Sequence, residues 1–261
     1  MASSMADNGL TGPCIGLVWD GTGLGTDGTS WGAECLAGDY AHFTRLGSIL
    51  PIPLIGGDRA VKEPYRVAFA LLRAAGCETD GIRDRVHLEK QLSAGLNCPL
   101  SSGMGRLFDG AASILGIKEV CNYEGQAAIL LEAAAGESGG SFPICFVPDE
   151  KESGLLCFDW RPMILALTAE RQAGTAVPIL AAKFMNTLIE MAAEQAAGAA
   201  VKTGIRQVVL SGGSFQNQYV MHRLPSRLKT RGLEVYHHRR VSCNDEGLSL
   251  GQLMIAAYKN K

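Results

Sequence analysis

Three strand-forming stretches of this chain each run into a turn built from glycine and polar residues. The first is residues 15–20, followed by GTGLGTDGT. The second is VVLSGGSF at residues 208–215, and the third is LEVYHHRR at 233–240, with an Asn-Asp-Glu-Gly turn close behind. Glycines at a strand end let the backbone approach a ligand closely and point amides at anionic oxygens. Because helical patterns separate the strands, the sequence predicts α/β layers and excludes an all-helical or all-β domain.

Apolar spacing and helix-ending glycines divide the chain into elements. Residues 1–14 are small and polar and predict a flexible leader; residues 15–136 form a first lobe, and residues 137–261 form a second α/β lobe that carries the Gly-Gly turn. Residues 31–49 predict further strands, and residues 137–157 predict irregular turns. Helices are predicted over 59–76, 103–116, 124–136, 177–200, 217–232 and 246–259.

Composition limits the classes of partner. The 261 residues carry a formal net charge of −2, which gives no electrostatic basis for binding nucleic acid or an anionic membrane. No apolar run reaches the length of a membrane span. The eight cysteines form no C-x-x-C pair and predict reduced thiols in a cytoplasmic protein.

The three turns are candidate binding elements, and each has a plain structural alternative. Asp20-Gly21-Thr22-Gly23 would place a metal-holding or hydroxyl-orienting acid beside free amides, although such sequences also form ordinary turns. Ser211–Asn217 would cradle a phosphate at a helix N-terminus, although it fits neither the Walker nor the Rossmann spacing. Asp245 would join Asp20 as an oxygen ligand for one metal, or Asn244-Asp245 would simply cap a helix. By analogy, the arrangement suggests the two-lobed plan of actin, sugar kinases and chaperone ATPases.

The motifs in order resemble the C-terminal transferase domain of the HypF family of hydrogenase-maturation carbamoyltransferases. More distantly, they resemble the tRNA threonylcarbamoyl transferases. The resemblance extends from about residue 15 over nearly the whole chain. Its strings are DGTGLGTDGTSWGAE (20–34), LAGDY (36–40), LGSILPIPLIGGDRAVKEPYR (46–66), SSGMGRLFDGAASILGI (101–117), NYEGQAAILLEAAA (122–135), LSGGSFQN (210–217) and HRRVSCNDEGLSLGQ (238–252).

The resemblance implies roles for single residues. It implies ATP or carbamoyl-adenylate as the ligand, and Asp20 and Asp245 as catalytic ligands of a divalent metal, iron or zinc. Phosphate or carbamoyl contacts fall to Gly21, Thr22 and Gly23, ribose contacts to Asp109, Glu124 and Gly125, and adenine-side contacts to Gly212, Gly213 and Asn217. A family loop near the site contains Asp58, Lys62 and Arg66, whose basic pair would equally suit a solvated helix face. The implied acceptor is the C-terminal cysteine thiol of a partner maturation protein, on the way to cyanide ligands of a nickel–iron hydrogenase.

The chain also departs from the family pattern. The H-x-x-x-H metal motif that the family places ahead of the DGTG turn is absent, so we expect an incomplete first lobe and an incomplete metal site. We therefore expect an N-terminal partner chain or segment, and self-association through exposed sheet edges. Two alternatives remain open: a non-catalytic nucleotide-binding subunit or fragment, and a small-molecule kinase of the same plan.

Overall fold

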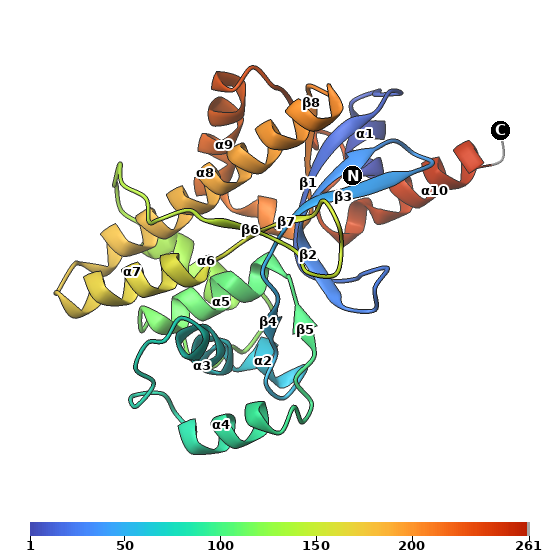
Figure 1. Cartoon of the computed structure of the whole chain (residues 1–261). Helices are drawn as coiled ribbons and strands as arrows, with labels where there is room; N and C mark the ends of the chain where they lie inside the picture. Colours follow the sequence, from blue (N-terminus) through green and yellow to red (C-terminus); the bar gives the residue numbers. More distant parts are fainter. Residues whose placement is uncertain (260–261) are drawn as a thin grey trace.

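The computed structural model of this protein describes residues 1–259. Its strands belong to one mixed sheet in the order β6-β7-β3-β2-β1-β8-β9, with β4 and β5 paired beside β2 (Figure 1). The strands are β1 (Cys14–Leu24), β2 (Ser30–Gly38), β3 (Phe43–Ile49), β4 (Ile52–Pro53), β5 (Leu100–Ser101), β6 (Phe146–Pro148), β7 (Leu156–Phe158), β8 (Gln207–Ser211) and β9 (Glu234–His237).

Strand β1 is the centre of the sheet and sets the position of the site. It pairs antiparallel with β2 on one side and parallel with β8 on the other. Its side chains Ile15, Leu17 and Trp19 are fully buried, as expected of a central strand covered by helices. Since β8 follows residue 136, strands from both predicted lobes share this sheet, and the lobe boundary itself stays a prediction.

Helices cover the sheet and extend away from it. The longest, α8, packs on α7 and α9, while α3, α5 and α6 form a second helical group next to the β4–β5 pair (Figure 1). The helices are α1 (Ala2–Asp7), α2 (Arg59–Lys62), α3 (Pro64–Ala74), α4 (Arg85–Ser93), α5 (Met104–Ile114), α6 (Gln126–Ala134), α7 (Arg161–Gln172), α8 (Val177–Thr203), α9 (Gln218–Thr230) and α10 (Leu248–Lys259), with short 3₁₀ turns η1 (Gly213–Gln216) and η2 (Asp245–Gly247).

The predicted α/β class is confirmed, and most of the predicted helices are present. The prediction over 59–76 becomes two helices, because Pro64 starts a new helix and cannot continue α2. Pro225 lies inside α9, which continues through it. The segment predicted as irregular contains β6 and β7, which are too short to give an alternating pattern.

The prediction of a flexible leader at the start of the chain is wrong for residues 2–7, which form helix α1 packed against α10. Met5 is fully buried, and Ser3 donates a hydrogen bond to the carbonyl oxygen of Gly247 at 2.7 Å. The carboxylate of Asp7 accepts hydrogen bonds from the amides of Arg239 and Arg240. The sequence does not predict this helix, because its residues are small and polar and it is stabilised by contacts with the far end of the chain.

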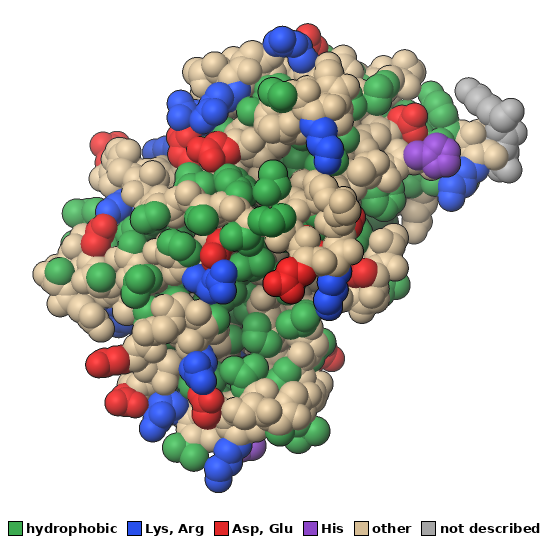
Figure 2. Space-filling model, viewed as in Figure 1, with side chains coloured by type: hydrophobic (Ala, Val, Ile, Leu, Met, Phe, Trp, Pro, Cys, Tyr) green, Lys and Arg blue, Asp and Glu red, His purple; other side chains and the backbone are tan. Residues whose placement is uncertain are grey.

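Two further features bear on the class of protein. Within residues 1–259, no helix is long and apolar enough to cross a membrane. The eight cysteines are all free thiols. The face shown in Figure 2 carries acidic and basic side chains scattered among apolar ones, rather than one large patch of a single sign.

Candidate nucleotide site

The turn predicted at residues 20–23 is part of β1, which continues to Leu24 with an irregular register between Trp19 and Gly23. Glycines allow three backbone segments to meet at this point of the strand. Gly212 has a φ of +106°, and a Cβ added there would lie 2.1 Å from the carbonyl oxygen of Trp19. A Cβ on Gly103, at the start of α5, would lie 2.1 Å from the carbonyl oxygen of Gly21. No side chain fits at such separations, so glycine is required where β1 meets the end of β8 and the start of α5.

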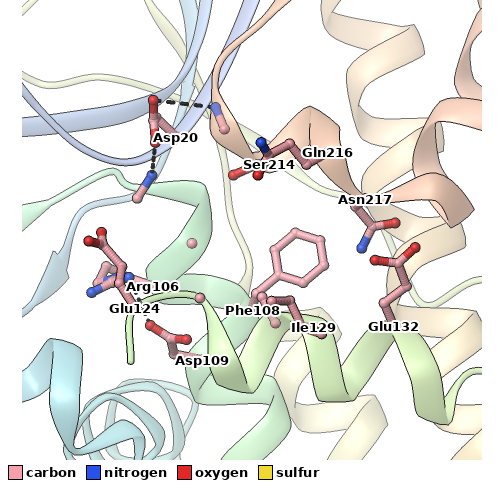
Figure 3. A pocket seen from close by; sticks show the side chains of 15 residues that line it. Asp20, Arg106, Phe108, Asp109, Glu124, Ile129, Glu132, Ser214, Gln216 and Asn217 are labelled. Atoms are coloured by element: carbon pink, nitrogen blue, oxygen red, sulfur yellow. Dashed lines mark hydrogen bonds and ion pairs between the residues drawn. The ribbon is translucent and has the colours of Figure 1, made fainter. Parts of the chain in front are cut away.

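A cavity of about 250 Å³ opens here, between β1 and the Gly-Gly turn on one side and α5 and α6 on the other (Figure 3). We call it the main cavity. Six predicted site residues other than Asp20 border it: Gly21, Asp109, Glu124, Gly125, Gly213 and Asn217. Its remaining lining includes Gly105, Arg106, Phe108, Ala128, Ile129, Glu132, Ser214 and Gln216.

Asp20 lines the cavity and connects β1 with the Gly-Gly turn. Its carboxylate accepts a hydrogen bond from the Gly21 amide at 2.7 Å and a longer one from the Gly213 amide at 3.4 Å (Figure 3). A Cβ on Gly213 would approach this carboxylate to 3.3 Å. Asp20 therefore fixes the separation of the turns on which the predicted phosphate contacts depend.

A cluster of charged side chains forms one end of the cavity. The guanidinium of Arg106 lies 2.9 Å from the carboxylate of Asp109, one helical turn away on α5, and both side chains are only 3% exposed. The contact is made by Asp109 Oδ2, and it lacks the geometry of a hydrogen bond; Arg106 Nε also has no hydrogen-bond partner. Burial raises the pKa of Asp109 to about 6, with Arg106 opposing the shift and Glu124 adding to it. Buried groups with unused hydrogen-bonding capacity facing a cavity indicate a polar ligand.

The rest of the cavity is apolar in the middle and polar at the far end (Figure 3). Phe108 and Ile129 lie between the charged cluster and Asn217. Asn217 caps α9, because its side-chain oxygen accepts a hydrogen bond from the Val220 amide at 3.0 Å. Glu132 from α6 also reaches the N-terminus of α9. An apolar slot with polar groups at both ends is the usual form of a site for a flat heterocycle carrying a polar sugar.

A second cavity of about 220 Å³ lies on the other side of Asp20, bordered by Gly212, His238 and Asp245. Asp20 and Asp245 thus share a cavity, as the metal prediction requires. The Nε2 of His238 lies 3.0 Å from the Ser211 hydroxyl, and burial lowers its pKa. However, residues 1–259 contain no group of three or more His, Cys, Asp or Glu side chains able to hold a metal ion. These two carboxylates alone fall short of the ligand set that iron or zinc needs.

Several predicted residues lie outside both cavities. Thr22 shares a hydrogen bond with Ser30 in the β1–β2 hairpin, and Gly23 pairs with Trp31 there. In the GGD loop, Asp58 precedes α2 and is exposed, and Lys62 ends that helix. Arg66 is buried in an ion pair with Glu63. It therefore does not lie on a solvated helix face, and it does not line the main cavity.

Sequence reasoning missed eight residues of the main cavity, among them four with large side chains: Arg106, Phe108, Ile129 and Glu132. Helical spacing offered the signal. Arg106 stands one turn before Asp109 on α5, and Ile129 and Glu132 stand one and two turns after Gly125 on α6, so each shares a helix face with a predicted residue.

The arrangement defines an actin-like protein with a cavity beside two glycine-rich segments, and the comparisons with known proteins identify the family. The family described as "Carbamoyltransferase, Kae1-like Domain, second subdomain" matches residues 16–252. A carbamoyltransferase HypF2 of Cupriavidus necator is 38% identical over 98% of this chain. The crystal structure of a full-length HypF in the phosphate- and nucleotide-bound form superposes with a TM-score of 0.92 at 35% identity, over 100% of this chain. This chain belongs to the HypF carbamoyltransferase family.

The same comparisons confirm the more distant resemblance and set its extent. A tRNA N6-adenosine threonylcarbamoyltransferase of Methylobacillus flagellatus is 28% identical over 71% of this chain. The chain spans about a third of the two HypF proteins named above, covering 35% of HypF2 of Cupriavidus necator and 35% of the crystallised HypF.

Proposed function

We propose that this chain binds ATP or carbamoyl-adenylate in the main cavity and serves carbamoyl transfer to the C-terminal cysteine thiol of a hydrogenase-maturation partner. The observation that carries the proposal is the cavity itself, which unites the DGTG turn, the Gly-Gly turn and the Arg106–Asp109 pair. Family membership supports it, as does the nucleotide in the crystallised relative.

The proposed reaction is an acyl transfer. The thiol sulfur attacks the carbonyl carbon of the carbamoyl group, the bond from that carbon to the phosphate oxygen breaks, and AMP leaves with the electron pair. The thiol proton passes to a base or to water. The products are a thiocarbamate on the acceptor and AMP. A group that stabilises negative charge on the departing phosphate would accelerate this step.

The residues of the cavity suit this assignment. Asp109 and Glu124 would accept hydrogen bonds from the ribose hydroxyls, and Gly213 and Asn217 would lie toward the base. Arg106 is the cationic side chain among the lining residues, and its guanidinium would lie 3.4 Å from a Cβ at Gly21. We propose that Arg106 supplies the positive charge that stabilises the departing phosphate.

A metal at the second cavity would need more ligands than residues 1–259 of this chain supply there. Asp20 and Asp245 would supply two oxygen ligands to iron or zinc, and further ligands would have to come from a segment or partner chain outside these residues. The same shortfall favours the second candidate, a nucleotide-binding subunit that performs no transfer alone.

One assay separates the two candidates. Carbamoyl-adenylate would be generated by the remaining domains of a HypF relative supplied in trans, and transfer of labelled carbamoyl to an acceptor peptide ending in cysteine would be measured. We expect label on the peptide, and none on a peptide ending in serine. Nucleotide binding without any label transfer would support the non-catalytic candidate, and absence of both would contradict the proposal.

A further inference from the structure

Glu132 occupies the end of the main cavity farthest from the charged cluster (Figure 3). Its Oε1 accepts two hydrogen bonds, from the Gln218 amide at 2.7 Å and the Tyr219 amide at 3.2 Å. These are the first amides of α9, where a carboxylate is also stabilised by the helix dipole. Two bonds to one oxygen fix the carboxyl group in place.

The second oxygen of Glu132 has no protein partner among residues 1–259. Since Glu132 lines the cavity and is half-buried, that oxygen is available to a ligand. A carboxylate oxygen only accepts hydrogen bonds, so the ligand group that meets it must be a donor.

The spacing along α6 matches the two ends of a nucleoside. Gly125, Ala128, Ile129 and Glu132 share the face of α6 that lines the cavity. From Gly125 to Glu132 the helix rises by roughly 10 Å, at about 1.5 Å per residue. If the ribose hydroxyls bind Asp109 and the purine ring lies over Phe108 and Ile129, the far edge of the base would reach Glu132.

We propose that Glu132 selects the base, by accepting a hydrogen bond from the exocyclic amino group of adenine. This rests on the proposed nucleotide function and adds the residue that reads the base. Hypoxanthine places a carbonyl oxygen where adenine has its amino group, and two acceptors would repel each other. Guanine offers two donors that suit a whole carboxylate, but Oε1 is already held by the α9 amides.

The substitution Glu132→Gln provides a sharp test, because the same two amides determine which way the new side chain points. The backbone N–H groups of Gln218 and Tyr219 can only donate, so the glutamine side-chain oxygen must face them. Its NH₂ group must then face the cavity. The variant therefore offers a donor where the native side chain offers an acceptor. A merely structural role for Glu132 would lower the affinity for all bases alike.

The experiment measures the Kd of the 261-residue chain for ATP and for ITP by calorimetry. We expect the native chain to prefer ATP by roughly 10- to 100-fold, the range typical of a hydrogen bond to a charged group. We expect Glu132→Gln to lose or reverse that preference, while Glu137→Gln, a matched change at an exposed residue, leaves it intact.

Each outcome bears on a separate statement. Equal affinity of the native chain for ATP and ITP overturns the inference and leaves nucleotide binding standing. An unchanged ATP preference in Glu132→Gln also overturns it. If that variant fails to fold, the native chain tested with ATP, ITP and purine riboside triphosphate still decides, because the inference requires affinities in the order ATP, purine, ITP. No binding of any nucleotide would contradict the proposed function itself.

Discussion

At the residue scale, the site depends on a few polar groups that the fold holds in buried positions, where ionisation is unfavourable. Asp109 is the clearest example, since its carboxylate is buried in an ion pair with Arg106 that lacks the geometry of a hydrogen bond. The cost of burying that charge appears in its raised pKa. A ligand that donates hydrogen bonds to the carboxylate would recover part of this cost.

The raised pKa of Asp109 predicts a pH dependence of nucleotide binding. Because that pKa is about 6, the carboxyl is ionised above pH 6 and becomes protonated as the pH falls through 6. Only the ionised form accepts two hydroxyl donors strongly, so ATP affinity should fall below pH 6 by up to about tenfold per pH unit. Titrations from pH 5 to 8 would measure this. Asp109→Asn should bind more weakly and show only the dependence due to the phosphates; an equal pH dependence in both proteins would refute the role.

The glycine crossing predicts a difference between two similar substitutions. Gly212 and Gly204 both have positive φ, but an added Cβ meets the Trp19 carbonyl at 2.1 Å at Gly212 and nothing within 4 Å at Gly204. Gly204→Ala should cost about 1 kcal/mol, the strain of the left-handed backbone. Gly212→Ala should cost roughly 3 kcal/mol or more because a clash is added. Denaturant unfolding measures the free energy of unfolding of both variants. Equal losses would show that Gly212 does not pack closely against the Trp19 carbonyl.

At the element scale, sequence patterns predicted the long helices and the central strand but not the elements that depend on distant partners. Leu107, Ala111 and Ile114 give α5 its apolar face, and that face is visible in sequence. Strands β6 and β7 have three residues each, and neither the pairing of β7 with β3 nor that of β6 with β7 can be read from so few residues. Helix α1 likewise depends on α10, more than two hundred residues away.

The attachment of α1 gives a prediction about stability. Although burial acts to raise it, the pKa of Asp7 is lowered to about 2 by the amides of Arg239 and Arg240 and by the Arg240 guanidinium, which lies 3.0 Å away. A lowered carboxyl pKa adds stability above its usual value near pH 4 and loses it as the pH falls toward 2. Asp7→Asn should therefore cost about 2 kcal/mol at pH 7 and little at pH 2.

Asp58→Asn is the matched control for this change, because Asp58 is exposed and its side chain does not cap α2. It should leave the free energy of unfolding nearly unchanged at both pH values. A loss at Asp7 that is the same at pH 7 and pH 2 would mean that the charge of Asp7 contributes nothing to holding α1.

At the scale of the whole molecule, the order of motifs predicted the family, and the fold explains why that order matters. Asp20 in β1 and the Gly-Gly turn after β8 are about 190 residues apart in sequence and meet because the two strands are neighbours. Sequence strings therefore located about half of the residues that line the cavity, including Asp20, Asp109 and Asn217. They did not locate Arg106 or Glu132, whose importance follows from facing the cavity, a property that one sequence does not display.

The exposed surface supports the prediction of self-association. Leu248 and Leu253 on α10 are 56% and 65% exposed, and β6 and β9 are the outer strands of the sheet. Such features favour contacts between copies. Light scattering should show an average mass that rises with concentration, and Leu253→Lys should reduce it. A monomer at all concentrations would contradict this expectation.

The central claim is that the cavity between the two glycine turns binds a nucleotide, and calorimetric titration of the native chain and of Asp109→Ala with ATP and a non-hydrolysable analogue tests it most directly. The account predicts that the native chain binds both ligands and that the variant loses at least tenfold in affinity, in line with the loss of charge-assisted hydrogen bonds. Equal binding by the two proteins would place the nucleotide elsewhere and contradict the account.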